Sequence, residues 1–173
     1  MALLTRITDE KAEGQVAEVF AALTAAIGEV PKPLRMLAGS PGLFMQQMGL
    51  VGYYRNHPHL DFSLLLCIRY LSAKKLNYRA CIDFNGSLLR KQGLAETEIA
   101  VMESDPGKAP LAEREKALLV FVLQAVDAGG SANKADMDRL KGYGWSESDI
   151  IDAVSQGVGM MTHGRMLEFF QMG

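Results

Sequence analysis

Apolar residues recur at every third or fourth position along most of this chain, which is the spacing of one face of an α-helix. The first such run follows Thr8, which we expect to be an N-cap, with Asp9 and Glu10 at the positive end of the helix dipole. Gly28 predicts the end of that helix. The face predicted to be buried carries Val16, Val19, Phe20, Leu23 and Ile27.

Three more helices are predicted between Ser40 and Gln92. Ser40-Pro41 pairs an N-cap residue with one favoured in the first turn, so a helix should start there. Asp61 is expected to cap the next helix, which runs to about Lys75 and is apolar on nearly all sides, so it should be central. Asn77 is expected to cap the helix from Tyr78 to Gln92.

The second half follows a polar, proline-containing loop from Ser104 to Pro110. One more helix is predicted just before this loop, from Glu96 to Met102, and the helices after it are predicted through Leu118 to Val126, from Lys134 to Leu140 and from Glu147 onward. No run of alternating apolar and polar residues predicts a strand. We therefore expect an all-α fold.

One local pattern occurs twice. The segment from Gly93 to Ile99 resembles the segment from Gly144 to Ile150, because each has a glycine, a short turn and an acidic first helical turn. This similarity is compatible with an internally duplicated helical unit and equally with two ordinary helix junctions.

Composition narrows the class of protein. The chain has 173 residues, 49% hydrophobic and 22% charged, so one domain spanning 1–173 with a substantial core is expected. The net charge of -2, without a basic stripe, argues against a nucleic-acid partner. The N-terminus has no secretory signal pattern, which favours a cytoplasmic location. The most apolar stretch, Phe62 to Leu71, is interrupted by Arg69 and is too short to cross a membrane.

Candidate chemistry centres on Cys81. On a helix that begins at Tyr78, the side chains of Tyr78, Cys81 and Asn85 project from one face. The positive end of the helix dipole favours the thiolate, and hence nucleophilic or redox reactivity. For a lone cysteine on an apolar face, a small buried core residue is an equal alternative.

The other cysteine and the histidines are weaker candidates. Cys67 lies among leucines and is expected to be structural. If the two cysteine-bearing helices pack antiparallel, Cys67 and Cys81 are offset by about 6 Å along the helix axes, which disfavours a disulfide. Both cysteines should therefore be free thiols. His163 could supply a base if the C-terminal helix folds back, although a surface position is more common. With His57 and His59 it shows no metal-binding spacing, and we expect no metal or cofactor.

From Leu60-Asp61 through Gly93-Leu94, the chain has an apolar helix, a short turn, a cysteine-bearing helix and a Leu-Arg-Lys-Gln-Gly-Leu ending. This order resembles the carboxymuconolactone decarboxylase and alkylhydroperoxidase D superfamily. Similar features occur at Glu13-Gly14, at Ser40-Pro41 and from Leu118 to Leu167, so the resemblance covers nearly the whole chain. It implies an orthogonal multi-helical bundle, a small-molecule substrate, and trimers or hexamers with sites near subunit boundaries.

The family motif, Cys-x-x-Cys-x-x-x-His, is degenerate in this chain. If Cys81 takes the second cysteine position, the first falls on Tyr78 and the histidine on Asn85. The family's relay glutamate and histidine, and the decarboxylase branch's histidine pair, correspond to Leu66, Ala80 and Phe84-Asn85. A two-cysteine peroxidase cycle needs a resolving thiol, which Tyr78 cannot supply. A single-cysteine cycle would need an external thiol reductant.

Three functions are open at this point. The first is a thiol enzyme in which Cys81, with Tyr78 and Asn85 as hydrogen-bonding partners, attacks a hydroperoxide or another small electrophile. This hypothesis predicts a lowered pKa for Cys81. The second is a decarboxylase or lactone-type acid-base enzyme in which Tyr78, Asn85 and His163 matter more than the thiol. The third is a non-catalytic oligomeric binding protein.

Overall fold

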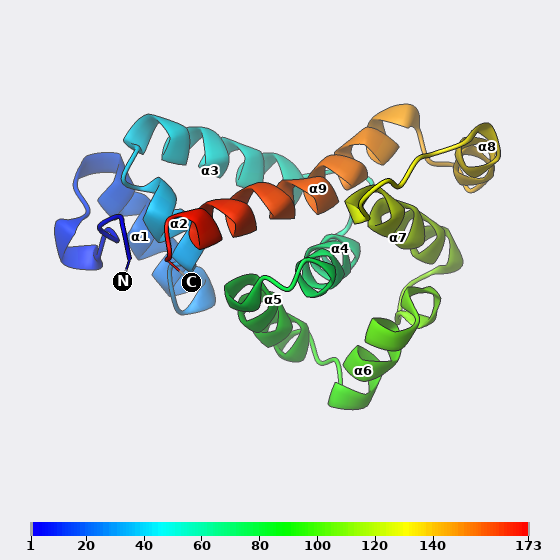
Figure 1. Ribbon diagram of the computed structural model, residues 1–173, viewed down its shortest axis with the longest axis horizontal. Coiled ribbons are helices and arrows are strands. Elements are labelled where there is room, and N and C mark those ends of the chain that lie inside the picture. The colour runs from blue at the N-terminus through cyan, green and yellow to red at the C-terminus, as the bar shows by residue number, and fades with distance from the viewer. Residues whose placement is uncertain (1, 173) are drawn as a thin grey trace. The chain divides into compact units, whose positions relative to one another are not determined.

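The computed structural model describes residues 2–172, and every regular element among them is helical, which confirms the all-α prediction (Figure 1). Contacts group the chain into two compact units. The first unit contains the described residues up to His57 together with those from Arg165 onward, and the second contains Pro58–Gly164. No helix of the described residues is both long and apolar enough to span a bilayer.

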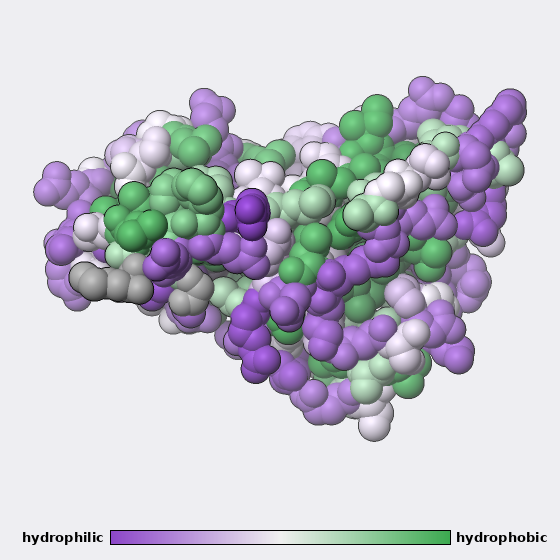
Figure 2. Space-filling view, viewed as in Figure 1, coloured by the Kyte–Doolittle hydropathy of each residue, from purple (hydrophilic) through white to green (hydrophobic). Residues whose placement is uncertain are grey.

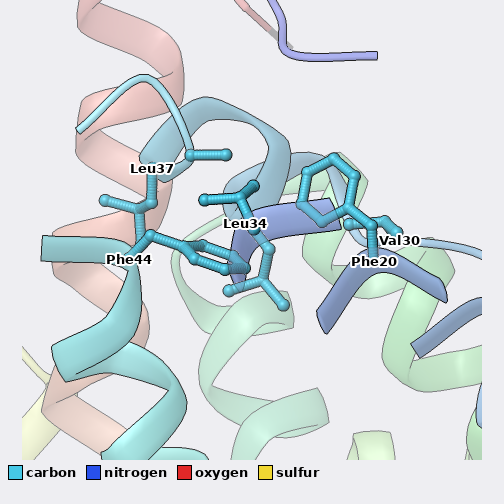
Figure 3. Close-up of a cluster of buried hydrophobic side chains, with 7 residues drawn as sticks. Phe20, Val30, Leu34, Leu37 and Phe44 are labelled. Atoms are coloured by element: carbon cyan, nitrogen blue, oxygen red, sulfur yellow. The ribbon is translucent and has the colours of Figure 1, made fainter. Parts of the chain in front are cut away.

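The first unit begins with a short 3₁₀ turn, η1 (Asp9–Lys11), and three helices, α1 (Gly14–Ile27), α2 (Lys32–Leu37) and α3 (Pro41–Arg55). Its core joins all three helices. Figure 3 shows Phe20 of α1, Leu34 and Leu37 of α2 and Phe44 of α3 gathered with Val30. The rings of Phe20 and Phe44 meet edge to face, with their centroids 5.8 Å apart. This packing buries apolar side chains of all three helices against one another and so stabilises the unit.

The predicted helix start at Thr8 is wrong. Ala12 and Glu13 are extended, and Gly14 has a φ of 53°, so the chain cannot run as one right-handed helix from Thr8 into α1. The predicted end is confirmed: Gly28 adopts the left-handed conformation, and its N–H donates to the Thr24 carbonyl at 2.9 Å.

The second unit contains α4 (Phe62–Lys75), α5 (Arg79–Lys91), α6 (Glu96–Ser104), the 3₁₀ turn η2 (Pro106–Lys108), α7 (Glu113–Val126), α8 (Lys134–Gly142) and the part of α9 (Glu147–Phe169) that ends at Gly164. As predicted, α4 is central, with α5 and α7 packed beside it (Figure 1). Asp61 caps it as predicted, because its Oδ1 accepts the N–H of Leu64 at 2.8 Å.

The predicted cap at Asn77 is wrong. Asn77 has a φ of 56° and ends α4 instead, in the left-handed conformation that glycine or asparagine adopts at this position. The N–H of the next residue, Tyr78, donates to the Ala73 carbonyl at 3.0 Å. Tyr78 then becomes the N-cap of α5, which begins one residue later than predicted. The tight turn folds α5 back along α4.

The repeated sequence pattern has a structural counterpart. Gly93 and Gly144 both have a positive φ, and both donate to a carbonyl three residues earlier at 2.9 Å. The backbone N–H groups of the next residues, Leu94 and Trp145, donate to the carbonyls five residues earlier at 3.2 Å. Because Asn77 ends α4 with the same pair of hydrogen bonds, the motif is a general helix ending in this chain. Internal duplication stays a prediction.

Candidate functional site

Cys81 is the third residue of α5, and only 4% of its surface is exposed. It packs in a cluster with Ala73 of α4 and Met160 of α9, and Tyr78 lies against the same cluster. Tyr78 reaches it from the N-cap position of α5, whereas we expected it within the first helical turn. The structure therefore brings Tyr78 and Cys81 together, in surroundings that are mainly apolar.

Burial controls the ionisation of Cys81. Removing the thiolate from water raises the pKa of the Cys81 thiol to about 11, well above its ordinary value. The helix N-terminus acts in the opposite direction, but it does not outweigh desolvation at this depth. The lowered pKa expected from the first hypothesis is therefore wrong, because the sequence could show the helix position but not the burial.

Asn85 lies one turn beyond Cys81 and is 3% exposed. Its amide nitrogen donates to the Cys81 carbonyl at 2.8 Å, so the amide bonds the backbone of Cys81. That bond fixes the amide orientation, since only the nitrogen can donate to a carbonyl oxygen. The Asn85 Oδ1 is then left buried without a hydrogen-bond partner.

Two more buried polar atoms without partners lie on α4. They are Arg69 Nε and Ser72 Oγ, which are three residues apart and so share a face of the helix. The Arg69 guanidinium lies over the Phe62 ring, with its Cζ 5.5 Å from the ring centroid. Neither residue was predicted as a site residue. The available signal was that Arg69 interrupts the most apolar stretch of the sequence.

The C-terminal helix does come back to the Cys81 region. A Cβ placed on Gly164 of α9 would lie 2.0 Å from the Tyr78 ring, so the α9 backbone passes directly against that ring. His163 is the preceding residue on α9 and is partly buried. Burial lowers the pKa of His163, which keeps its imidazole neutral at pH 7. No hydrogen bond joins His163 to Cys81 among the described residues.

Comparison with solved structures places this arrangement in a known fold. The crystal structure of an alkylhydroperoxidase AhpD core, an uncharacterized peroxidase-related protein from Ralstonia eutropha, matches with a TM-score of 0.83 and 18% identity, over 99% of this chain and 91% of that one. An uncharacterized peroxidase-related protein from Silicibacter sp. matches with a TM-score of 0.77 and 17% identity, over 98% and 86%. The chain has the alkylhydroperoxidase D-like fold. The predicted fold type is thereby confirmed.

A third similar structure is the debrominase Bmp8, solved as a cysteine-to-alanine variant in complex with 2,3,4-tribromopyrrole. Its TM-score is 0.80 at 17% identity, over 99% of this chain and 92% of that one. Neither a scan against models of protein families nor a search of curated proteins gave a match.

Within this alkylhydroperoxidase D-like fold, Cys67 is also a buried free thiol. Burial, followed by the negative charges of Asp61 and Glu115, raises its pKa to about 12. It borders a hollow of about 150 Å³ that is also lined by Leu66 and Glu98. A thiol with so high a pKa is a poor nucleophile at neutral pH, which agrees with the structural role expected for Cys67.

A larger hollow, of about 570 Å³, lies where α4, α6 and α7 end in this fold. Lys74, Lys75, Glu103 and Asp127 line it, and each lysine pairs with an acid: Lys74 with Glu103 at 3.0 Å and Lys75 with Asp127. None of the predicted site residues lines this hollow. The charges of these four residues are thus already paired with one another.

One polar cluster of the fold was not anticipated. Asp149 is 4% exposed and accepts from the N–H and hydroxyl of Ser146, and its other oxygen lies 2.8 Å from Nδ1 of His59. Burial alone would raise the pKa of Asp149, but these hydrogen bonds outweigh it and lower the pKa. The Ser146 hydroxyl contacts the carboxylate and not the imidazole, so the cluster caps α9 and is no nucleophilic triad. Within residues 2–172, no three His, Cys, Asp or Glu side chains are placed to hold a metal ion.

Proposed function

We propose that this chain is a single-cysteine thiol enzyme, related to peroxidases, that acts on a small electrophile such as a hydroperoxide. The observation that carries the proposal is the position of Cys81, on the first turn of α5 and enclosed by α4 and α9 beside Tyr78 and Asn85. The fold is shared with two peroxidase-related proteins and with a debrominase whose complex was solved as a cysteine-to-alanine variant.

The proposed reaction needs one protein thiol. The Cys81 sulfur attacks the terminal oxygen of the hydroperoxide, the O–O bond breaks, and the alcohol leaves with the thiol proton. An external thiol then condenses with the Cys81 sulfenic acid, which releases water and forms a mixed disulfide. A second external thiol breaks this disulfide, leaves as the oxidised reductant and restores Cys81. Cys67 takes no part, so the missing resolving cysteine is not an obstacle.

The high pKa limits the speed of this reaction. With a pKa of about 11, about one Cys81 in a thousand is a thiolate at pH 8. We therefore expect slow turnover of free hydroperoxide at neutral pH, with a rate that increases as the pH rises toward 10.

Consumption of tert-butyl hydroperoxide in the presence of dithiothreitol tests the proposal. The wild-type protein and Cys67→Ser should consume peroxide faster than dithiothreitol alone, and Cys81→Ser should not. The two substitutions are matched, because each replaces a buried free thiol by a hydroxyl. Equal rates for Cys81→Ser and wild type, with both proteins folded by circular dichroism, would rule out the thiol mechanism.

An acid-base enzyme is the second candidate, and the observation that favours it is the position of the partly buried His163, next to Gly164, whose backbone lies against the Tyr78 ring. A neutral imidazole accepts protons at pH 7, and Tyr78 lies against the same part of α9. On this alternative, Cys81→Ala retains turnover of the substrate and His163→Gln loses it.

A further inference from the structure

The thiol of Cys81 is enclosed by other side chains. Only 4% of the residue is exposed, and Cys81 lines neither of the two hollows described above. Ala73 and Met160, which share its cluster, are buried as well. The cluster reaches the surface at its partly buried members, which are Leu76, Tyr78 and Ile82. Among the apolar side chains around the sulfur, these three are the ones that a reagent from solvent meets first.

Tyr78 lies in the direction in which the Cys81 side chain points. Side chains of a helix lean toward its N-terminus, so the Sγ of Cys81 is directed over the first turn of α5. Tyr78 is three residues earlier, and its carbonyl accepts the Cys81 N–H at 3.0 Å, so the two residues share a face of that turn. Ile82 is turned by about 100° around the helix axis. Tyr78 is therefore the residue of this group that covers the sulfur most directly.

A glycine of α9 makes room for the Tyr78 ring. A Cβ on Gly164 would lie 2.0 Å from Cδ2 of that ring, 2.1 Å from Cε2 and 2.3 Å from Cγ. One edge of the ring therefore rests on the α9 backbone itself. Any residue with a Cβ at this position would push the ring out of its place.

The backbone of Tyr78, in contrast, is held on both sides. Its N–H donates to the Ala73 carbonyl at 3.0 Å, and its own carbonyl accepts the N–H groups of Cys81 at 3.0 Å and Ile82 at 2.9 Å. A motion that uncovers the sulfur and keeps these hydrogen bonds is a rotation of the Tyr78 side chain. No helix has to open for it.

We propose that the ring of Tyr78 controls access to Cys81: it covers the sulfur while it rests on Gly164, and a small electrophile reaches the sulfur when the ring turns away. That this electrophile is a substrate rests on the proposed thiol function. The role belongs to the ring and not to the hydroxyl. It selects small reagents over bulky ones, because the opening is about the size of the ring that leaves it.

Alkylation by two neutral maleimides of different size tests this proposal without any turnover. N-ethylmaleimide and the bulkier N-phenylmaleimide both add to the thiolate. The ratio of their rates, divided by the same ratio for free glutathione, therefore measures access and not the pKa of the thiol. In a Cys67→Ser background, the parent protein should disfavour the bulkier reagent by at least about fivefold, because extra atoms are costly to fit into a packed site.

Substitutions of Tyr78 separate the ring from the hydroxyl. Tyr78→Ala should react with N-ethylmaleimide at least about tenfold faster at pH 8, because water reaches the thiolate and the pKa of Cys81 falls toward its ordinary value. It should also lose the discrimination against N-phenylmaleimide. Tyr78→Phe should keep both the slow alkylation and the discrimination.

Three further variants serve as a second test and as controls. Gly164→Ala displaces the Tyr78 ring and should also speed up alkylation of Cys81, whereas Gly159→Ala, which meets nothing within 4 Å, should not. Phe121→Ala removes a buried ring of α7 outside the Cys81 cluster, so it controls for a loss of stability without a change at the thiol.

Three results would overturn the role of Tyr78. They are a parent protein with the size ratio of free glutathione, an unchanged rate in Tyr78→Ala, and a rate in Tyr78→Phe or Phe121→Ala as high as that in Tyr78→Ala. The first of these does not depend on whether Tyr78→Ala folds. Alkylation involves no peroxide, so access control can fail while the thiol mechanism stands, and the thiol mechanism can fail while access control stands.

Discussion

Two opposing effects act on the side chain of Cys81. Its place in the first turn of α5 favours the thiolate, while its burial among Ala73 and Met160 favours the neutral thiol. Desolvation is the larger effect, because the cluster contains no cation that could stabilise the negative charge. Cys81 is therefore a protonated, protected thiol at rest, and its reactivity depends strongly on pH.

Alkylation by iodoacetamide measures this state directly. In a Cys67→Ser background, the rate at Cys81 should rise about tenfold for each pH unit between 8 and 10, since the thiolate fraction does so below a pKa of about 11. An ordinary cysteine would level off soon after pH 9. A plateau in that range would show that burial does not control Cys81.

The left-handed backbone conformation of Asn77 can also be tested by substitution of this single residue. Its φ of 56° is favourable for glycine and tolerable for asparagine, but costly for other residues. We expect Asn77→Ala to lower the free energy of unfolding by about 1 kcal/mol and Asn77→Gly to leave it nearly unchanged. Urea denaturation measures both, and equal losses for the two variants would contradict the assigned backbone conformation.

Asp61 and Asn77 also show what single residues reveal in a sequence. Asp61 directly precedes a long apolar run, which is the position of a helix N-cap, so its capping role could be predicted. Asn77 can begin a helix or end one, and the choice depends on how tightly α5 folds back on α4. Arg69 could be recognised as unusual, but the missing hydrogen-bond partner of its buried Nε depends on contacts from other helices.

At the scale of elements, two glycines allow close packing of the part of α9 that belongs to the second unit. Gly157 lets the α9 backbone approach Val122, and Gly164 lets it approach the Tyr78 ring, more closely than a Cβ would allow. This close approach brings Met160 into the Cys81 cluster. The spacing of apolar residues predicted the helix itself. The sequence could not show which neighbouring side chains the glycines of this helix would pack against.

The glycines of α9 give a matched pair of substitutions. Gly164→Ala should lower the free energy of unfolding by about 1 to 3 kcal/mol, because the new Cβ would overlap the Tyr78 ring. Gly159→Ala meets nothing within 4 Å and should be neutral or stabilising by up to about 1 kcal/mol, since alanine favours helix. Thermal or urea unfolding of both variants checks the prediction, and similar effects would argue against the packing of α9 on Tyr78.

At the scale of the whole molecule, the helical pattern fixed the fold class but not the exact start of every helix. The sequence predicts a start of the first helix at Thr8, because Thr8, Asp9 and Glu10 have the pattern of an N-cap and an acidic first turn. In the structure, α1 begins only at Gly14, because Ala12 and Glu13 have an extended backbone. Apolar side chains also remain exposed, including Ile151, Val158 and Met161 of α9, and Figure 2 shows apolar surface over this helix. Homo-oligomerisation stays a prediction.

The two buried thiols predict how the stability of the molecule changes with pH. Their pKa values are raised to about 12 for Cys67 and about 11 for Cys81, so above pH 9 the unfolded chain loses protons that the folded chain retains. The stabilisation from the neutral thiols is complete below about pH 9 and falls as the pH rises toward 11. Melting temperatures under reducing conditions at pH 8 and 10.5 should therefore differ less in Cys81→Ala than in wild type. An equal fall in both proteins would contradict the burial of Cys81.

Trapping of a sulfenic acid on Cys81 is the most direct test of the proposal that Cys81 is the reacting thiol. Wild-type protein is treated with tert-butyl hydroperoxide and dimedone at pH 8, without dithiothreitol, and its cysteine peptides are analysed by mass spectrometry. We predict a dimedone adduct on the peptide that contains Cys81 and none on the peptide that contains Cys67. Absence of the Cys81 adduct, or equal modification of both cysteines, would contradict the proposal that Cys81 is the reacting thiol.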